Sequence, residues 1–375
     1  MKTDSDLTRL HEYIKETLPW AHGHQHKALT KFVNAIFDKQ TGCQAQLART
    51  LGNQEAGCKQ LARLLHNQRL SEKRLAESVC RQALRQVPRH GLVRVTLDWT
   101  SEGDQHLLAL SLIIGRRAVP IFWRAYDQRV LKGRMKGYEL AVVKRAFKRL
   151  FQVVAPRRVF LTADRGFPDE DLFALLERLG VKFILRVKNC VKVQSTGRWQ
   201  KLNTFGFRGN ERQRALGWRP YCERSPRRLW ITMHRARDKQ GHWGTWYLVS
   251  NRQLSPAAMA REYARRFGCE EGFRDTKWYL GFKRARVRAI RAWSRLFALF
   301  ALALLALVTL GTYLLLRDPD SARRLLRRVA SRRQGRCELS LVTATLSLLQ
   351  QDRVWLACLL PFTKFNLETT LANVS

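Results

Sequence analysis

Acidic side chains are scarce in this sequence. Its 375 residues include 30 Asp and Glu against 69 Lys and Arg, which gives a formal net charge of +39 at pH 7. A field of that sign repels cations and attracts polyanions, so nucleic acid is the first partner to expect and an anionic membrane surface the second. The charge therefore argues against an enzyme of small neutral metabolites. The basic excess runs through the whole chain and is densest in residues 191–250, which hold 13 basic and 3 acidic side chains.

Paired cysteines and a secretory leader are lacking as well. The eight cysteines are scattered and form no Cys-x-x-Cys pair, which argues against a zinc ribbon. The chain opens with Met-Lys-Thr-Asp-Ser-Asp and no apolar run, so we expect no signal peptide and reduced thiols in the cytoplasm. With 45% hydrophobic residues the chain can bury a sizeable core, and its length favours two to three domains of ~150 residues each.

Long hydrophobic runs are rare, and the longest lies between Leu296 and Leu316. This run is long enough to span a bilayer. The alternative is a buried helix at the centre of a water-soluble protein. We favour burial, because no second span exists and the rest of the chain indicates nucleic acid, so we expect no membrane partner.

The chain changes character near residue 91. Before it, apolar residues recur at helical spacing, with helices expected at 44–51, 59–69 and 72–85, so residues 1–90 form a small all-α domain. That domain either recognises a DNA site or serves packing alone. After it the pattern predicts strands at 92–97, 106–114, 118–123, 158–163 and 182–187 and helices at 138–151 and 169–179.

The order of these elements, β-β-β-α-β-α-β, is that of a ribonuclease-H-like mixed sheet. We therefore place an α/β catalytic domain at 91–318, with a β-rich insertion at about 191–250 that holds five tryptophans. A helical C-terminal region follows at 319–375. It contains a basic amphipathic stretch at 321–331 and an apolar helix near 339–349.

Two carboxylates stand at strand ends. Asp98 and Asp164 each terminate a strand that the ribonuclease-H-like order places in the centre of the sheet, where the two side chains can converge. Magnesium prefers oxygen ligands, and phosphoryl transfer favours two ions that clamp the attacking and leaving oxygens. A pair of aspartates in this place is a candidate metal site that needs a third acid.

The helix expected after the insertion supplies a third acid. Tyr263, Arg266, Glu270 and Lys277 fall within a sector of ~60° if the helix is continuous at ~100° per residue. One face then presents a carboxylate between a phenol and two cations. The alternative is a solvated charged stripe on an ordinary surface helix.

Three motifs in order resemble the DDE transposases of bacterial insertion sequences, specifically the Tyr-Arg-Glu-Lys signature group (IS-four-like). The first is Leu97-Asp98-Trp99-Thr100, and the second runs from Thr162 through Asp164 to Phe167. The third is the spaced segment from Tyr263 to Lys277. The resemblance covers roughly residues 90–315. Gly268 and Cys269 depart from the family's pattern between Arg266 and Glu270. Gly268 and Gly272 each cost a helix about 1 kcal/mol relative to alanine.

The resemblance implies a metal-binding triad of Asp98, Asp164 and Glu270, holding two Mg²⁺ ions for which Mn²⁺ can substitute. Tyr263, Arg266 and Lys277 match the signature residues that contact phosphates near the cleaved end. An insertion tryptophan would stack on a flipped base. We choose Trp246 among Trp199, Trp218, Trp230, Trp243 and Trp246.

The resemblance further implies a cut-and-paste transposase that cuts the ends of its element and joins them to target DNA, often through hairpin ends. Its partners would be double-stranded DNA, both terminal inverted repeats and target, and a second copy of the chain in a homodimer. The expected place is the bacterial cytoplasm, associated with the nucleoid. Two alternatives remain: a DNA-end-binding regulator that does not cut, and a ribonuclease-H-fold nuclease unrelated to mobile elements.

Overall fold

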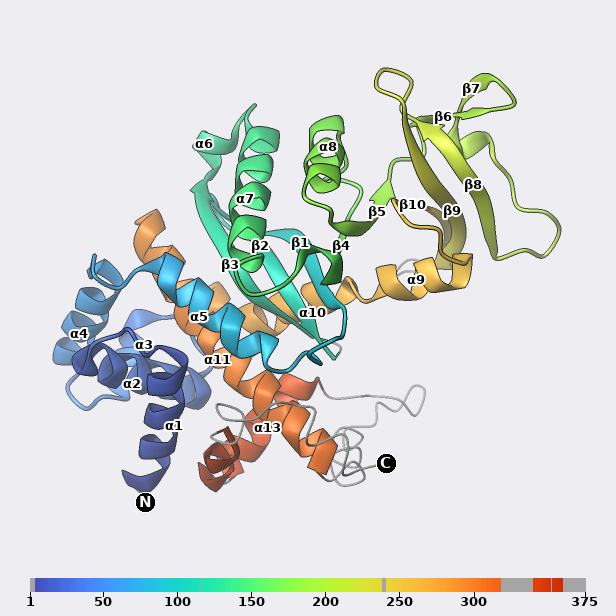
Figure 1. Ribbon diagram of the computed structural model, residues 1–375. Helices are drawn as coiled ribbons and strands as arrows, with labels where there is room; N and C mark the ends of the chain where they lie inside the picture. The colour runs from blue at the N-terminus through green and yellow to red at the C-terminus, as the bar shows by residue number, and fades with distance from the viewer. Residues whose placement is uncertain (1–3, 116, 238–240, 318–339, 352, 360–375) are drawn as a thin grey trace. The chain divides into compact units, whose positions relative to one another are not determined.

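The computed structural model describes residues 4–115, 117–237, 241–317, 340–351 and 353–359 (Figure 1). The chain divides into two compact units. Unit 1 comprises residues 1–91, 99–131 and 269–375, and unit 2 comprises residues 92–98 and 132–268. The expected stretch at 321–331 lies outside the described residues.

The N-terminal part of unit 1 is helical, as predicted. It contains α1 (Asp4–Thr17), α2 (Gly23–Lys39), α3 (Gln44–Arg49), α4 (Gln54–His66) and α5 (Glu72–Leu84). Side-chain caps fix where two of these helices begin, because a cap satisfies backbone N–H groups that have no partner within the helix. Asn53 accepts hydrogen bonds from the N–H groups of Glu55 and Ala56, and Ser71 accepts one from Arg74.

The apolar run forms α11 (Ile290–Arg317), the central helix of unit 1 (Figure 1). It packs against α2, α4, α5 and the C-terminal helix α13 (Leu341–Gln351). Gln86 donates a buried hydrogen bond of 2.7 Å to Thr309 in its middle. By length and composition α11 is apolar enough to cross a membrane, yet 89% of its most apolar window is buried inside the protein. The prediction of a core helix is confirmed, and so is the apolar helix expected near 339–349.

Unit 1 also holds a β-hairpin. Strand β2 (Gln105–Ile114) pairs antiparallel with β3 (Arg117–Asp127), and α5 and α11 pack on β3. The turn before β2 contains Gly103 at a φ of 55°. Trp123 of β3 meets Phe297 of α11 edge to face at 5.5 Å between ring centroids, which joins hairpin and helix in one core.

Unit 2 is built on a mixed sheet. Its strands are β1 (Val93–Glu102, of which the first part lies in this unit), β4 (Val159–Ala163), β5 (Lys182–Val187), β6 (Lys192–Ser195), β7 (Arg198–Lys201), β8 (Gln213–Tyr221), β9 (Arg227–Arg237) and β10 (Trp243–Ser250). In space they run β1-β4-β5-β10-β9-β8-β6-β7. Strands β1, β4 and β5 are parallel, and the remaining pairs are antiparallel.

Helical crossovers connect the parallel strands of unit 2, as predicted. Helix α7 (Met135–Leu150) precedes β4, and α8 (Glu170–Arg178) precedes β5. Asp169 caps α8 by accepting a hydrogen bond from the N–H of Leu172. The expected insertion is β-rich, and its strands extend the sheet of unit 2 through the pairing of β10 with β5. A β-rich segment thus adds to the edge of the parallel core.

Helix α9 (Pro256–Ala264) packs on this sheet. Met259 and Tyr263 are fully buried against Phe160, Ile184 and Leu248 of strands β4, β5 and β10. A bidentate pair between the Arg94 guanidinium and the Glu262 carboxylate, at 2.7 and 3.0 Å, ties the helix to β1. The helix end that carries Tyr263 is thereby fixed on the sheet.

A buried histidine on β9 predicts how the stability of the protein depends on pH. Burial lowers the pKa of His234 to about 4, whereas an unfolded histidine titrates near ~6.5. Between these values the unfolded chain binds a proton that the folded chain does not, so stability falls as the pH drops below ~6.5. We expect the free energy of unfolding to decrease by about 2 kcal/mol between pH 7 and pH 5 from this group.

His234→Gln should remove that part of the decrease, measured by denaturant unfolding at both pH values. His90→Gln, at an exposed position, should leave the pH dependence unchanged. Equal pH slopes in the wild-type protein and the His234 variant would show that the buried imidazole does not carry the effect.

Candidate functional site

Asp98 and Asp164 lie on neighbouring strands of unit 2. Strand β1 pairs in parallel with β4, and the last pair of their register is Leu97 with Ala163. The two aspartates each follow that pair directly. Because the strands run in the same direction, both carboxylates come side by side beyond the carboxyl end of β4. The expected strand end at Asp98 is wrong, because β1 continues through Asp98 to Glu102.

A buried arginine holds the first of these carboxylates. The Arg266 guanidinium is 4% exposed and places Nη1 3.2 Å from Oδ2 of Asp98. The Cζ atom of the guanidinium lies 5.6 Å from the ring centroid of Tyr263 and 5.3 Å from that of Phe267. A desolvated cation between two aromatic rings and an aspartate is held firmly in one geometry.

A phenol and a second arginine hold the other carboxylate. The Tyr263 hydroxyl donates a hydrogen bond of 3.0 Å to Oδ1 of Asp164, and Nη1 of Arg186 lies 3.6 Å from the same oxygen. Burial would raise the pKa of Asp164, but the backbone N–H of Arg165 and the charge of Arg266 outweigh it, together with the Tyr263 hydroxyl and Arg186. The net effect lowers that pKa below its usual value and keeps the carboxylate ionised.

Trp246 of β10 stands beside this group. Its ring lies 5.4 Å from that of Tyr263, edge to face, and 5.8 Å from that of Phe267. The Arg186 guanidinium lies 5.7 Å from its centroid. Trp246 is therefore the insertion tryptophan that touches the rings packed around the aspartates, and its stacking on a base remains a prediction.

The signature residues do not lie on one straight helix, and this prediction was wrong. Helix α9 ends at Ala264, two turn residues follow, and α10 (Phe267–Arg274) begins after them. Residues Asp275–Tyr279 are π-helical, closed by a 2.8 Å hydrogen bond from the N–H of Leu280 to the carbonyl of Asp275. A π-turn contains an extra residue, so Lys277 is rotated away from the direction that a regular α-helix predicts.

The glycine at 272 has a packing reason. A Cβ at Gly272 would lie 2.5 Å from the carbonyl oxygen of Ala118 in β3. The backbone of α10 therefore approaches the strand more closely than any side chain allows. This close contact within unit 1 explains why a glycine stands in the helix at this position.

Glu270, Glu271 and Lys277 belong to unit 1. The Lys277 ammonium donates to the carbonyl of Ser101, and Glu102 lies 4.0 Å away. Burial lowers the pKa of Lys277, Glu102 opposes that shift and Lys283 adds to it. Glu271 is engaged by Arg117 at 3.8 Å and by Arg274.

A basic strip follows Lys277 in unit 1. Residues 283–288 alternate between exposed arginines (Arg284, Arg286, Arg288) and buried Ala285 and Val287. Trp278 is 62% exposed, and the Lys283 ammonium lies over its ring, 3.9 Å from the centroid. Sequence reasoning missed this strip, although its alternation of Arg with apolar residues was a signal.

Arg186 was missed as well. It follows the buried residues Phe183-Ile184-Leu185 within β5, and a cation inside a buried part of a strand is a signal for a partner acid.

The two carboxylates of unit 2, Asp98 and Asp164, have the donor chemistry that a hard divalent cation prefers, because carboxylate oxygens are the ligands of Mg²⁺. Within the described ranges, no three His, Cys, Asp or Glu side chains are gathered closely enough to hold an ion. Arg266 and Arg186 instead neutralise the two aspartates of unit 2. The arrangement is a pair of carboxylates with two arginines and a phenol, suited to a metal or to phosphate chemistry.

Comparison with known proteins shows to which family part of the sequence is similar. Residues 133–307 match the family model described as the transposase DDE domain. The matched range includes Asp164, Trp246, Tyr263, Arg266, Glu270 and Lys277, and Asp98 precedes it. No curated protein matches the chain. Over this range the chain is similar to transposase DDE domains, which supports a DDE transposase.

Proposed function

We propose that this chain is a cut-and-paste DNA transposase of the Tyr-Arg-Glu-Lys signature group with a ribonuclease-H-like core. What supports this most is the pairing of β1 with β4, which sets Asp98 beside Asp164 at one edge of the sheet. The order β1-β4-β5 in unit 2, with α7 and α8 in the crossovers, is the order that such a core requires. We also propose that the catalytic domain spans residues 91–318 and that a helical C-terminal region spans residues 319–375.

In this proposal Asp98, Asp164 and Glu270 hold two Mg²⁺ ions, which when bound activate water and neutralise charge on the phosphate. Tyr263 and Arg186 orient Asp164 through the contacts at 3.0 and 3.6 Å. Arg266 holds Asp98 in the DNA-free chain and contacts a phosphate near the cut end in the complex. Lys277 contacts a second phosphate.

Two surfaces support DNA as the partner. Arg284, the last residue of a short 3-10 helix, and Arg286 and Arg288 after it are all exposed, so their guanidinium groups are available to bind a phosphate backbone. In the insertion, Trp243 is 54% exposed, and the guanidinium groups of Arg237 and Arg212 lie 4.6 and 5.9 Å from its ring. Exposed aromatic rings beside arginines suit stacking on bases together with binding of phosphates.

The proposed partners are the terminal inverted repeats of an element and a target duplex, bound by a homodimer in the bacterial nucleoid. Cleavage proceeds by in-line attack of water on a phosphodiester at the repeat end, which frees a 3′-hydroxyl. That hydroxyl attacks the opposite strand, which forms a hairpin and releases the flanking DNA. A second water opens the hairpin, and the regenerated 3′-hydroxyl then attacks target DNA. Trp246 stacks on the flipped base that a hairpin needs.

Incubation with a duplex that carries the inverted repeats flanking the gene tests this function. With Mg²⁺ or Mn²⁺ we expect nicking at the repeat ends and joining to a second plasmid, and with EDTA neither product. Binding without any cut would instead indicate a regulator, and cutting without preference for ends would indicate a nuclease unrelated to mobile elements.

A further inference from the structure

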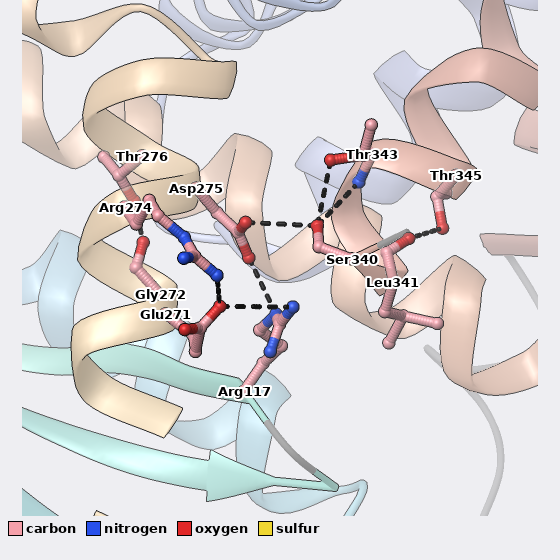
Figure 2. Close-up of polar contacts among 10 residues, drawn as sticks. All are labelled: Arg117, Glu271, Gly272, Arg274, Asp275, Thr276, Ser340, Leu341, Thr343 and Thr345. Carbon is pink, nitrogen blue, oxygen red and sulfur yellow. Dashed lines mark hydrogen bonds and ion pairs between the residues drawn. The ribbon is translucent and has the colours of Figure 1, made fainter. Parts of the chain in front are cut away.

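Unit 1 contains a buried polar cluster (Figure 2), centred on a residue that lies between Glu270 and Lys277 in the sequence. Its centre is Asp275, five residues after Glu270 and two before Lys277, with no exposed surface. The Arg117 guanidinium, from the first residue of β3, places Nε 2.8 Å from Oδ2 of Asp275. The Ser340 hydroxyl donates a hydrogen bond of 3.1 Å to Oδ1 of the same carboxylate.

Asp275 is also the first residue of the π-turn. Its carbonyl accepts the 2.8 Å hydrogen bond that closes the turn, while its side chain is held from two sides. Three residues earlier, the backbone of α10 at Gly272 lies close to the carbonyl of Ala118. The Thr276 hydroxyl donates a hydrogen bond of 2.8 Å to the carbonyl of Gly272. Adjacent residues of β3, Arg117 and Ala118, thus fix the segment that leads to Lys277.

Ser340 connects this segment to the C-terminal helix. Its hydroxyl accepts a hydrogen bond of 3.0 Å from the N–H of Thr343 and so caps α13. The same hydroxyl reaches Asp275, which Figure 2 shows as one continuous set of dashed lines from Thr343 through Ser340 and Asp275 to Arg117. A residue that stands 65 positions beyond Asp275 in the chain therefore contributes to the geometry of the signature segment.

We propose that Asp275, held by Arg117 and by the Ser340 cap of α13, is a positioning residue that sets the π-turn and thereby the place of Lys277. The action of Lys277 on DNA rests on the proposed function, and its placement does not. A buried ion pair is a weak source of stability, because desolvation of both charges offsets their attraction. We infer that the pair of Asp275 with Arg117 instead fixes the geometry of the π-turn. Such π-turns occur often at functional sites.

Lysine reactivity tests the placement without any use of activity. The full chain is treated with acetic anhydride, and modification of each lysine is measured by mass spectrometry, with exposed Lys59 as the internal reference. Lys277 is held on the carbonyl of Ser101, so its reactivity reports the π-turn. We expect Ser340→Ala to raise the modification of Lys277 relative to Lys59 about five-fold, the effect of losing one hydrogen bond.

Thr345→Ala is the matched control. It removes a hydroxyl from the same helix, one that bonds the carbonyl of Leu341 at 2.7 Å and does not contact Asp275. We expect it to leave the Lys277 modification at the wild-type value. Asp275→Asn should raise that modification more than Ser340→Ala does, and if this variant does not fold, Ser340→Ala decides the question.

Equal modification of Lys277 in the wild-type chain and in Ser340→Ala would overturn the proposal, as would equal increases in Ser340→Ala and Thr345→Ala. This outcome is separate from the cleavage assay. A wild-type chain that binds DNA and never cuts it contradicts the proposed function, while the labelling result still decides whether the cap places Lys277.

If the chain does cut, a double-mutant cycle gives the second readout. Ser340→Ala should slow nicking of pre-bound DNA about five-fold in the wild-type background and leave the rate unchanged in a Lys277→Ala background. Equal slowing in both backgrounds would assign Ser340 a role in stability alone.

Discussion

Asp164→Asn is expected to abolish strand cleavage while leaving the binding of DNA ends close to the wild-type affinity. Asparagine keeps the size of the side chain and an oxygen that accepts the Tyr263 hydroxyl, now at 3.0 Å. It removes the negative charge that a divalent cation needs, and a metal site contributes several kcal/mol to phosphoryl transfer. At a factor of ten for each ~1.4 kcal/mol, the nicking rate should fall by about a thousand-fold or more.

The measurement is single-turnover nicking of pre-bound, end-bearing DNA in Mg²⁺, with affinity taken from a gel-shift titration. Asp127→Asn is the control, because Asp127 also pairs with an arginine, Arg129, at 3.0 Å, but is not among the proposed metal ligands. It should cut at the wild-type rate. Nicking by Asp164→Asn at a rate near that of wild type would remove Asp164 from the proposed triad.

Much of the scaffold of this site could be predicted from the sequence. Alternation of apolar residues and short turns located β1 to β5, and the order of the elements placed Asp98 and Asp164 on adjacent strands. These features are local or topological, so a single sequence contains them. That α11 is buried could also be predicted, from its composition and from the lack of a second apolar run long enough to span a membrane.

The contacts around the aspartates could not be predicted, because they depend on packing between distant segments. Spacing placed Tyr263 and Arg266 on one helical face, and a turn between α9 and α10 instead lets each approach a different aspartate. The π-turn at Asp275 has no local signal either, since it arises where Arg117 and Ser340 hold the carboxylate. Helical propensity does not anticipate such tertiary constraints.

Gly281→Ala is expected to destabilise unit 1 by about 4 kcal/mol or more, enough to unfold a marginally stable protein. Gly281 has a φ of 81°, and a Cβ there would lie 2.0 Å from the carbonyl oxygen of Gln40, the residue that ends α2. The neighbouring backbone cannot move away easily, because the N–H of Gly42 donates a 2.8 Å hydrogen bond to the carbonyl of Gly281. An added methyl group would therefore clash with the backbone of Gln40, and the positive φ would strain the alanine backbone as well.

The matched variant is Gly52→Ala, which separates the effect of the steric clash from the effect of backbone strain. Gly52 has a φ of 95°, and a Cβ added there would meet no atom within 4 Å, so alanine should cost only the ~1 kcal/mol of a left-handed backbone. Urea unfolding of both variants, together with their soluble yield, gives the comparison. Equal losses of stability would mean that strain alone explains Gly281. A much larger loss at Gly281 would show that the segment after Lys277 is held by direct backbone contact with the end of α2, so that the helical N-terminal region is part of what supports the signature segment.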